Sequence, residues 1–396
     1  MIGELFNQHS NLPAPMSPSA IHKARWAIAL TFLVHGSIVG SWVPHIPLAK
    51  DRLDVGTGIF GLALLTIALG AIIAMPISGA LINRYGSARV TAVTGIAFCF
   101  AFILPPLAPD LTSFLAAALV FGASIGSMDV AMNAHGVAVE KAMRRPTMSL
   151  LHGAFSVGAM TGSLLGALLL SEMSESSHIL LAWAICLAVF IPCIVFFLPS
   201  AIDKGLSGQG FAWPTRATIG LGILCFLALV AEGAVVDWSG LMLRGRFQLE
   251  AGTAALGFAA FAAGMSLSRF LGDRLRVHLG ATRLVRWSAF LMALGLAVAL
   301  VVPLPAIAIA ALAVAGIGIG NAVPILFAGG GRLEPDAPGR GIAAVTTLGY
   351  AGFLAGPPII GFLAELTGLT LALGLVVLAS LIIAASARAA GASDAY

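Results

Sequence analysis

The strongest constraint on the fold is a series of twelve apolar runs that follow one another along the whole chain. Each run has roughly 20 residues, which is the length that an α-helix needs to cross the hydrocarbon of a bilayer. Only 10% of the 396 residues are charged, whereas soluble domains carry about 25%. The sequence therefore predicts an all-α membrane protein with twelve transmembrane helices. We place them at residues 26–48, 59–82, 90–108, 112–138, 148–170, 178–198, 217–242, 254–272, 284–303, 305–328, 342–364 and 368–387.

Basic residues gather on one side of the predicted helices. Sixteen of the 21 lysines and arginines lie in segments on the same side as the two termini, and four lie in loops on the other side. Because cytoplasmic loops carry the excess of Lys and Arg, we expect both termini in the cytoplasm. The net charge of +4 is then a topology signal, and we expect no nucleic-acid partner.

Short stretches of the chain return at a constant separation of 194 residues. GSAR at 86–89 returns as GATR at 280–283, and GASIG at 122–126 returns as GIGIG at 316–320. Further glycines match at the same separation. An even number of helices per copy gives two copies of the same orientation, related by an axis along the membrane normal. The sequence therefore predicts two pseudo-symmetric bundles of six helices each.

A polar interval rich in Gly and Ser separates the two copies, as expected of a linker. We predict five segments on this basis: a disordered cytoplasmic N-terminal segment 1–24, an N-terminal six-helix bundle 25–198, a cytoplasmic linker 199–216, a C-terminal six-helix bundle 217–388 and a cytoplasmic tail 389–396.

Two parallel six-helix halves with a central linker resemble the major facilitator superfamily. The stretch GALINRYGSAR at 79–89 resembles the family signature between helices 2 and 3, although Asn83 stands where the family usually has Asp. Residues 128–158 and 232–244 resemble a narrower branch of bacterial inner-membrane transporters around YbjJ and MosC. The resemblance implies a monomer in the bacterial inner membrane that works by alternating access. It also implies that the signature loop and its second-half counterpart have a gating role, with Arg84, Arg89, Asp273 and Arg274 as the gating residues.

Asp129 is the first candidate for proton coupling. A charge at the centre of a transmembrane helix costs about 2.5–3.5 kcal/mol, so such residues usually face a cavity and serve a function. The equivalent position in the second half is Val323, so the duplicated scaffold does not require the acid. Asn133 lies four residues on, and a carboxyl group on this polar face could take up and release a proton as the cavity opens to either side. The alternative is a buried Asp that only holds a neighbouring helix.

Glu232 and Asp237 are the other two candidates for proton coupling, and either acid could instead bind a substrate hydroxyl. At 100° per residue they point about 140° apart on their helix, so they do not share one proton site. Asp237 has a second reading, in which it caps the outer gate through Arg244 or Arg246.

Several polar or aromatic residues in the predicted helices are candidates for substrate binding. His35 and Trp42 are seven residues apart on one face and suit a polar, ring-shaped ligand, although Trp42 could equally lie in the interfacial aromatic belt. His152 has a gating or loop-capping alternative, and Arg269 is expected to snorkel from a helix end. The full set of substrate candidates is His35, Trp42, Asn133, His152, Trp238, Asn321 and Tyr350.

No nucleotide-binding loop, metal-ligand spacing or nucleophile–base motif occurs in the sequence. We therefore expect no enzyme activity, no metal and no cofactor. The interpretation that fits best is a secondary-active transporter that moves a small polar, sugar-like solute in symport with protons. Its partners are the solute, protons and the lipid bilayer. The resemblance agrees, because fucose-permease-like members of the superfamily also use a carboxylate on helix 4. Two alternatives stay open: a proton-driven exporter of a metabolite or drug, and a membrane sensor that binds a ligand without moving it.

Overall fold

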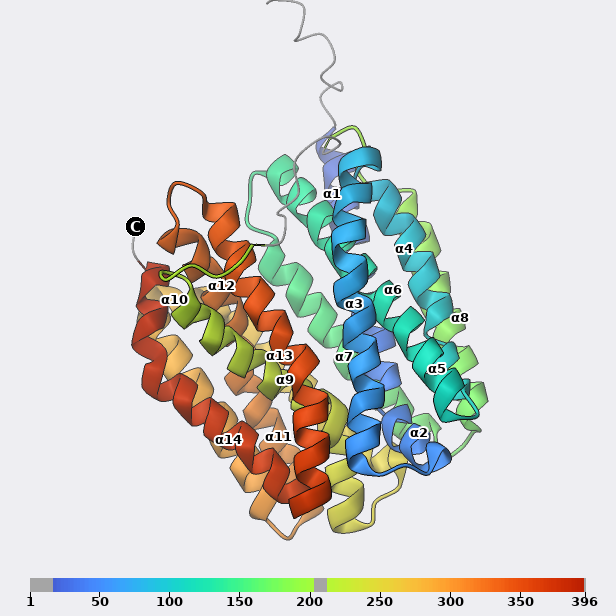
Figure 1. Cartoon of the computed structure of the whole chain (residues 1–396). Helices are drawn as coiled ribbons and strands as arrows, with labels where there is room; N and C mark the ends of the chain where they lie inside the picture. Colours follow the sequence, from blue (N-terminus) through green and yellow to red (C-terminus); the bar gives the residue numbers. More distant parts are fainter. Residues whose placement is uncertain (1–16, 203–211, 395–396) are drawn as a thin grey trace, which may run out of the picture.

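The computed structural model describes residues 17–202 and 212–394. Within these ranges the regular secondary structure is entirely helical (Figure 1). Twelve spans in the same ranges are long and apolar enough to cross a membrane. The predicted all-α class and the count of twelve are confirmed.

The first half of the chain folds into eight helical segments that make six spans. They are α1 (Pro18–Trp42), α2 (His45–Leu53), α3 (Thr57–Tyr85), α4 (Ser87–Ala101), α5 (Leu104–Leu107), α6 (Leu111–Met143), α7 (Met148–Leu169) and α8 (Glu175–Ile194). Here α2 continues the span of α1, and α5 continues that of α4.

The second half gives six further spans from fewer segments. They are α9 (Ile219–Phe247), α10 (Ala251–Val301), α11 (Pro305–Ile319), α12 (Ala322–Leu333), α13 (Pro338–Thr367) and α14 (Leu369–Ser386), followed by the 3₁₀ helix η2 (Ala387–Asp394). The long α10 holds two spans that break at Gly280, while α11 and α12 together make one.

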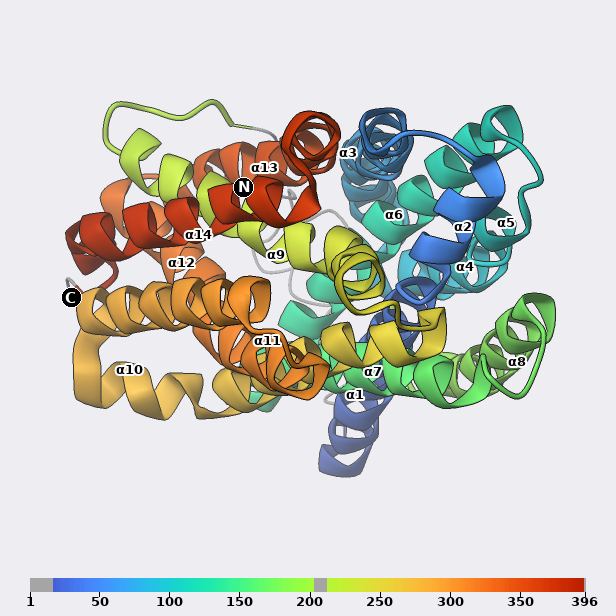
Figure 2. The ribbon, with the colours of Figure 1, turned by 90° about the horizontal axis from the view of Figure 1, so that it is seen from below.

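The spans alternate between two ends of the bundle. We call the end where α1 begins and α14 ends the terminal end, and the end that carries α2 the far end (Figure 1). Figure 2 shows the two halves side by side. Between them, α3 packs against α13 and α7 packs against α10.

The first helix begins earlier than the sequence analysis predicted. Ser17 lies in an extended conformation and its side chain accepts a hydrogen bond from the Ala20 N–H at 3.2 Å, while Pro18 occupies the first helical position. Both features are typical of a helix start. The prediction of disorder is therefore wrong for residues 18–24. Residues 1–16 of the predicted N-terminal segment and residues 203–211 of the predicted linker lie outside the described ranges.

Close packing of glycines repeats in the two halves. A Cβ placed on Gly122 would collide with the carbonyl oxygen of Ile67, and one placed on Gly316 would collide with that of Phe261. Ile67 and Phe261 are themselves 194 residues apart. The spacing found in the sequence is thus matched by contacts in space, and α6 approaches α3 in the way that α11 approaches α10.

The turn that follows the second span of each half is also repeated. Gly86 has φ 83° and ψ 153°, and Gly280 has φ 71° and ψ 162°. An L-residue with a side chain rarely adopts this region of positive φ. Glycine at both positions therefore lets the chain reverse within one residue.

Candidate functional site

Three of the predicted site residues meet inside the bundle. The Asn133 amide donates to the Asp129 carboxylate at 3.1 Å and to the Asp129 carbonyl at 2.9 Å, both on α6. From α13 in the other half, the Tyr350 hydroxyl donates to the second carboxylate oxygen of Asp129 at 3.4 Å. All three side chains keep partial exposure. The contact between Asp129 and Tyr350 joins the two halves at this point.

Glu232 and Arg269 form a second polar group, which lies in the second half and contacts the first half. The Arg269 Nη2 lies 3.6 Å from the Glu232 Oε1, and the side chains are 12% and 14% exposed. Arg269 also donates to the Ser156 hydroxyl of α7 at 2.6 Å. The prediction that Arg269 snorkels from a helix end is therefore wrong, because the Glu232 carboxylate compensates its charge inside the bundle.

His152 lies on α7 one turn before Ser156. The Ser156 hydroxyl donates to the His152 carbonyl at 3.1 Å, and the His152 ring meets the Phe32 ring edge-on at 5.5 Å. The half-buried imidazole therefore borders the space around Arg269. Its role in substrate binding stays a prediction.

His35 and Trp42 are enclosed by other side chains of the first half. The His35 ring is 2% exposed, packs edge-on against Phe98 at 4.7 Å and Phe155 at 5.5 Å, and neither ring nitrogen has a hydrogen-bond partner. Trp42 is 4% exposed and packs against Phe114 and Phe121. In this conformation neither residue contacts the Asp129 group, and their roles as substrate contacts stay predictions.

Asp237 and Trp238 lie further toward the far end of α9. Trp238 is fully buried against Phe60 of the first half, with ring centroids 6.4 Å apart. The side chain of the half-buried Asp237 makes no hydrogen bond or ion pair with any described residue. Its second reading, as a cap of the outer gate, is wrong here, because Arg244 pairs with Asp51 and Arg246 donates to backbone carbonyls.

The remaining candidates lie elsewhere. Asn321 is buried at the break between α11 and α12, and its amide donates to the carbonyl and hydroxyl of Ser268 at 2.9 and 2.8 Å. The predicted gating residues Arg84, Arg89 and Arg274 are exposed at the terminal end, and the Asp273 side chain lies outside the described part of the structure. Their gating role is still a prediction.

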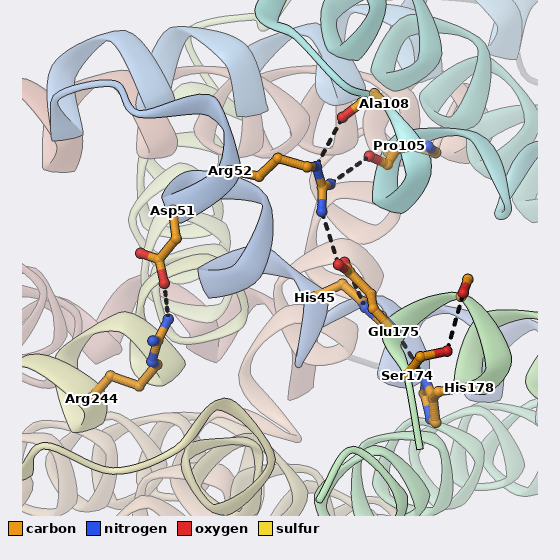
Figure 3. A network of polar contacts seen from close by, with 10 residues as sticks. His45, Asp51, Arg52, Pro105, Ala108, Ser174, Glu175, His178 and Arg244 are labelled. Carbon is orange, nitrogen blue, oxygen red and sulfur yellow. Dashed lines mark hydrogen bonds and ion pairs between the residues drawn. The ribbon is translucent and has the colours of Figure 1, made fainter.

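A buried polar cluster at the far end was missed by the sequence analysis (Figure 3). The His45 Nδ1 lies 3.2 Å from the Glu175 Oε1, and the His45 Nε2 lies 2.9 Å from the His178 Nδ1. Arg52 donates to the other Glu175 oxygen at 2.9 Å. We call these four residues the far-end cluster. Among the described residues, no group of three His, Cys, Asp or Glu side chains could hold a metal ion.

Two contacts tie the halves together next to this cluster. Arg244 of α9 donates to the Asp51 carboxylate of α2 at 2.7 Å (Figure 3). The Glu365 carboxylate of α13 accepts from the Gly58 N–H in the first turn of α3 at 2.9 Å. No sequence motif connects these pairs, which are 193 and 307 residues apart. For Asp51 and Arg244, opposite charges at helix ends were the available signal, and the Gly58 backbone N–H gave none.

Comparison with known proteins identifies close sequence relatives. The family described as Major Facilitator Superfamily matches residues 26–329. An uncharacterised MFS-type transporter of Yersinia pestis is 35% identical over 368 residues, which cover 91% of this chain and 94% of the relative. The membrane protein MosC of Rhizobium meliloti is 31% identical over 367 residues, covering 90% of this chain and 88% of MosC.

Solved structures share the fold at low sequence identity. The nucleoside transporter NupG has a TM-score of 0.68 at 14% identity, covering 94% of this chain and 98% of its own. The fucose:proton symporter FucP of E. coli has a TM-score of 0.63 at 15% identity, covering 92% of this chain and 97% of its own.

Proposed function

Since the chain belongs to the major facilitator superfamily and is a membrane transporter, we propose that it moves a small polar, sugar-like solute by alternating access in symport with protons. We place it as a monomer in the bacterial inner membrane with both termini in the cytoplasm. The terminal end then faces the cytoplasm. Asp51–Arg244 and Glu365–Gly58 close the far end in the conformation described here.

The contact between Asp129 and Tyr350 carries the proposal. An ionised Asp129 accepts the Tyr350 hydroxyl across the two halves, and a protonated Asp129 loses the charge that strengthens this bond. The distance of 3.4 Å is long for an O–H···O bond, so the bond is weak and breaks readily when the halves separate. Proton binding and the relative position of the halves are therefore linked at one carboxylate.

Asp129 is preferred over Glu232 as the proton carrier because of their partners. Glu232 lies next to the Arg269 guanidinium, which keeps the pair neutral without a proton. Asp129 is held by an amide and a hydroxyl, and no cation among the described residues is in hydrogen-bond contact with it. A carboxylate at this depth without a cation is costly to keep ionised. Asp237 shares that property and is the third candidate.

The groups around the interior suit a hydroxyl-bearing solute. Asn133, Tyr350 and Ser156 offer donors and acceptors from both halves. Sites with several hydrogen-bonding groups discriminate strongly in favour of solutes that pair with them. The nucleoside transporter NupG and the fucose:proton symporter FucP, which share the fold, support a solute that contains a sugar ring.

The experiment has two stages. A thermal-shift screen of the purified protein against sugars, polyols, nucleosides, carboxylates and amines identifies a bound solute. Flux of that solute is then measured in proteoliposomes with the acid on the far side. Symport predicts accumulation inside the vesicle together with alkalinisation of the outer medium. Export against the proton gradient would support the antiporter alternative, and binding without flux would support a sensor.

A further inference from the structure

The far-end cluster is built so that one histidine contacts partners through both ring nitrogens. His45 and His178 are 0% and 1% exposed. Glu175 and His178 face His45 from α8 (Figure 3). Arg52 lies on α2, the helix of His45 itself, and donates to Glu175. Arg52 is also fixed to the first half through the Ala108 carbonyl, to which its Nε donates at 2.9 Å. No other charged side chain contacts the two imidazoles within the described ranges.

Both protonation states of His45 keep these hydrogen bonds. A neutral His45 donates from Nδ1 to Glu175 and accepts at Nε2 from the His178 N–H. A protonated His45 donates from both nitrogens, and His178 then accepts at Nδ1 in its other tautomer. Proton uptake therefore leaves no ring nitrogen of His45 without a partner, which is unusual for a buried imidazole.

Far-side water reaches this cluster through the Glu175 carboxylate. Glu175 is one of the residues that line a cavity of about 930 Å³ at the far end, between the two halves. The other charged residues along this cavity are Lys50, Asp51, Arg244 and Glu250. A proton from the far side can therefore enter without crossing the apolar part of the bundle.

We propose that the His45–Glu175–His178 arrangement is a second proton-binding site, separate from Asp129, and that it couples far-side pH to closure of the far end. The coupling runs through α2. His45 and Arg52 hold this short helix to α8 and to the Ala108 carbonyl. The neighbouring Asp51 holds it to Arg244 of the other half at 2.7 Å. The position of α2 therefore decides whether Asp51 can reach Arg244.

The direction of the effect follows from burial. The His45 and His178 rings are 0% and 1% exposed, and burial disfavours the charged form of an imidazole. The closed far end then binds the proton less tightly than an open one in which water reaches the ring. By linkage, the closed population shrinks as the pH falls through the range in which exposed imidazoles titrate, near pH 6.5, and grows as the pH rises.

The test measures far-end closure directly, without solute and without a gradient. The full-length protein carries spin labels at Ser171→Cys and Glu250→Cys, which lie on opposite halves along the far-end cavity. Distances are recorded in lipid nanodiscs between pH 5 and pH 8.5. The ratio of the short to the long distance population should fall at least about threefold on acidification, within the limit of tenfold per pH unit for one proton.

Two variants assign the response, and both are made in labelled protein that carries Asp129→Asn, so that the proposed coupling site cannot titrate. His45→Gln should make the ratio independent of pH. His278→Gln, an exposed histidine at the terminal end, is the matched control and should respond as the Asp129→Asn parent does.

Two outcomes overturn the proposal: a parent ratio that does not change with pH, and a His45→Gln protein that responds as the parent does. If His45→Gln does not fold, His45→Asn decides. This variant should also make the ratio independent of pH. A response like that of the parent in this variant contradicts the proposal.

Discussion

The Arg269 guanidinium and the Glu232 carboxylate lie 3.6 Å apart inside the second half, and each side chain is less than 15% exposed. Removing one partner of a buried pair leaves the other charge uncompensated, whereas removing both does not. Arg269→Gln alone should therefore lower the free energy of unfolding by up to about 3–5 kcal/mol. The double variant Glu232→Gln/Arg269→Gln should recover most of that loss. Thermal unfolding in detergent measures both, and a double variant that is no more stable than Arg269→Gln would argue against compensation between the two side chains.

Glycine packing predicts an effect that is repeated in the two halves. Gly122→Ala and Gly316→Ala place a methyl group against the carbonyl oxygens of Ile67 and Phe261. The helices must then move apart, at a cost of about 1–3 kcal/mol. Gly374→Ala in α14 is the control, since a Cβ there meets open space and alanine favours a helix by about 1 kcal/mol. Equal thermal stability of all three variants would show that these close approaches do not limit the fold.

His35 separates a packing role from a binding role. Both ring nitrogens are buried without a partner, and burying a polar group without a hydrogen bond is unfavourable. His35→Leu should therefore keep or raise the thermal stability of the protein. If His35 is also a substrate contact in another conformation, as the sequence predicts, the same variant should lose the thermal shift caused by the solute. An unchanged shift would remove His35 from the site.

The Glu140 carboxylate predicts a local effect on α7. It accepts from the Thr147 N–H at 2.6 Å and from the Met148 N–H at 2.9 Å, where α7 begins. Glu140→Ala leaves these donors without their carboxylate and should lower the free energy of unfolding by about 1–2 kcal/mol. Hydrogen exchange of the first turn of α7 should rise in the variant, and exchange equal to that of the parent would mean that water replaces the carboxylate.

The fold could be predicted from the sequence because each part of it depends on local physics. Span length sets the helices, and the 194-residue spacing sets the duplication, whose glycine contacts recur in space. The meeting of Asp129 with Asn133 was predictable from their spacing of four on one helix. Its contact with Tyr350 was not, because 221 residues separate the two.

The errors have physical causes as well. Arg269 was placed by its distance from a helix end. That distance gives the depth of the residue in the membrane but not the side of the helix to which its side chain points. The presence of one buried acid, Glu232, on the preceding span was the signal for their pairing. The far-end cluster was missed because His45 and Glu175 are 130 residues apart and lie at the ends of apolar runs, where polar residues are expected on a surface. Only the turn after Val43 and the start of α8 bring them together.

Gradient-driven accumulation by Asp129→Asn tests the central claim most directly. The substitution keeps the shape of the side chain but replaces the proton-binding carboxyl group with an amide, which has one acceptor oxygen instead of two. Asp54→Asn is the matched control, since Asp54 is exposed and has a positive φ of 49° that Asn tolerates. In proteoliposomes with the acid outside, Asp54→Asn should accumulate solute as the parent does. Asp129→Asn should only equilibrate the solute, while still exchanging labelled for unlabelled solute across the membrane. Accumulation by Asp129→Asn against a concentration gradient, at the level of the parent, would contradict the account.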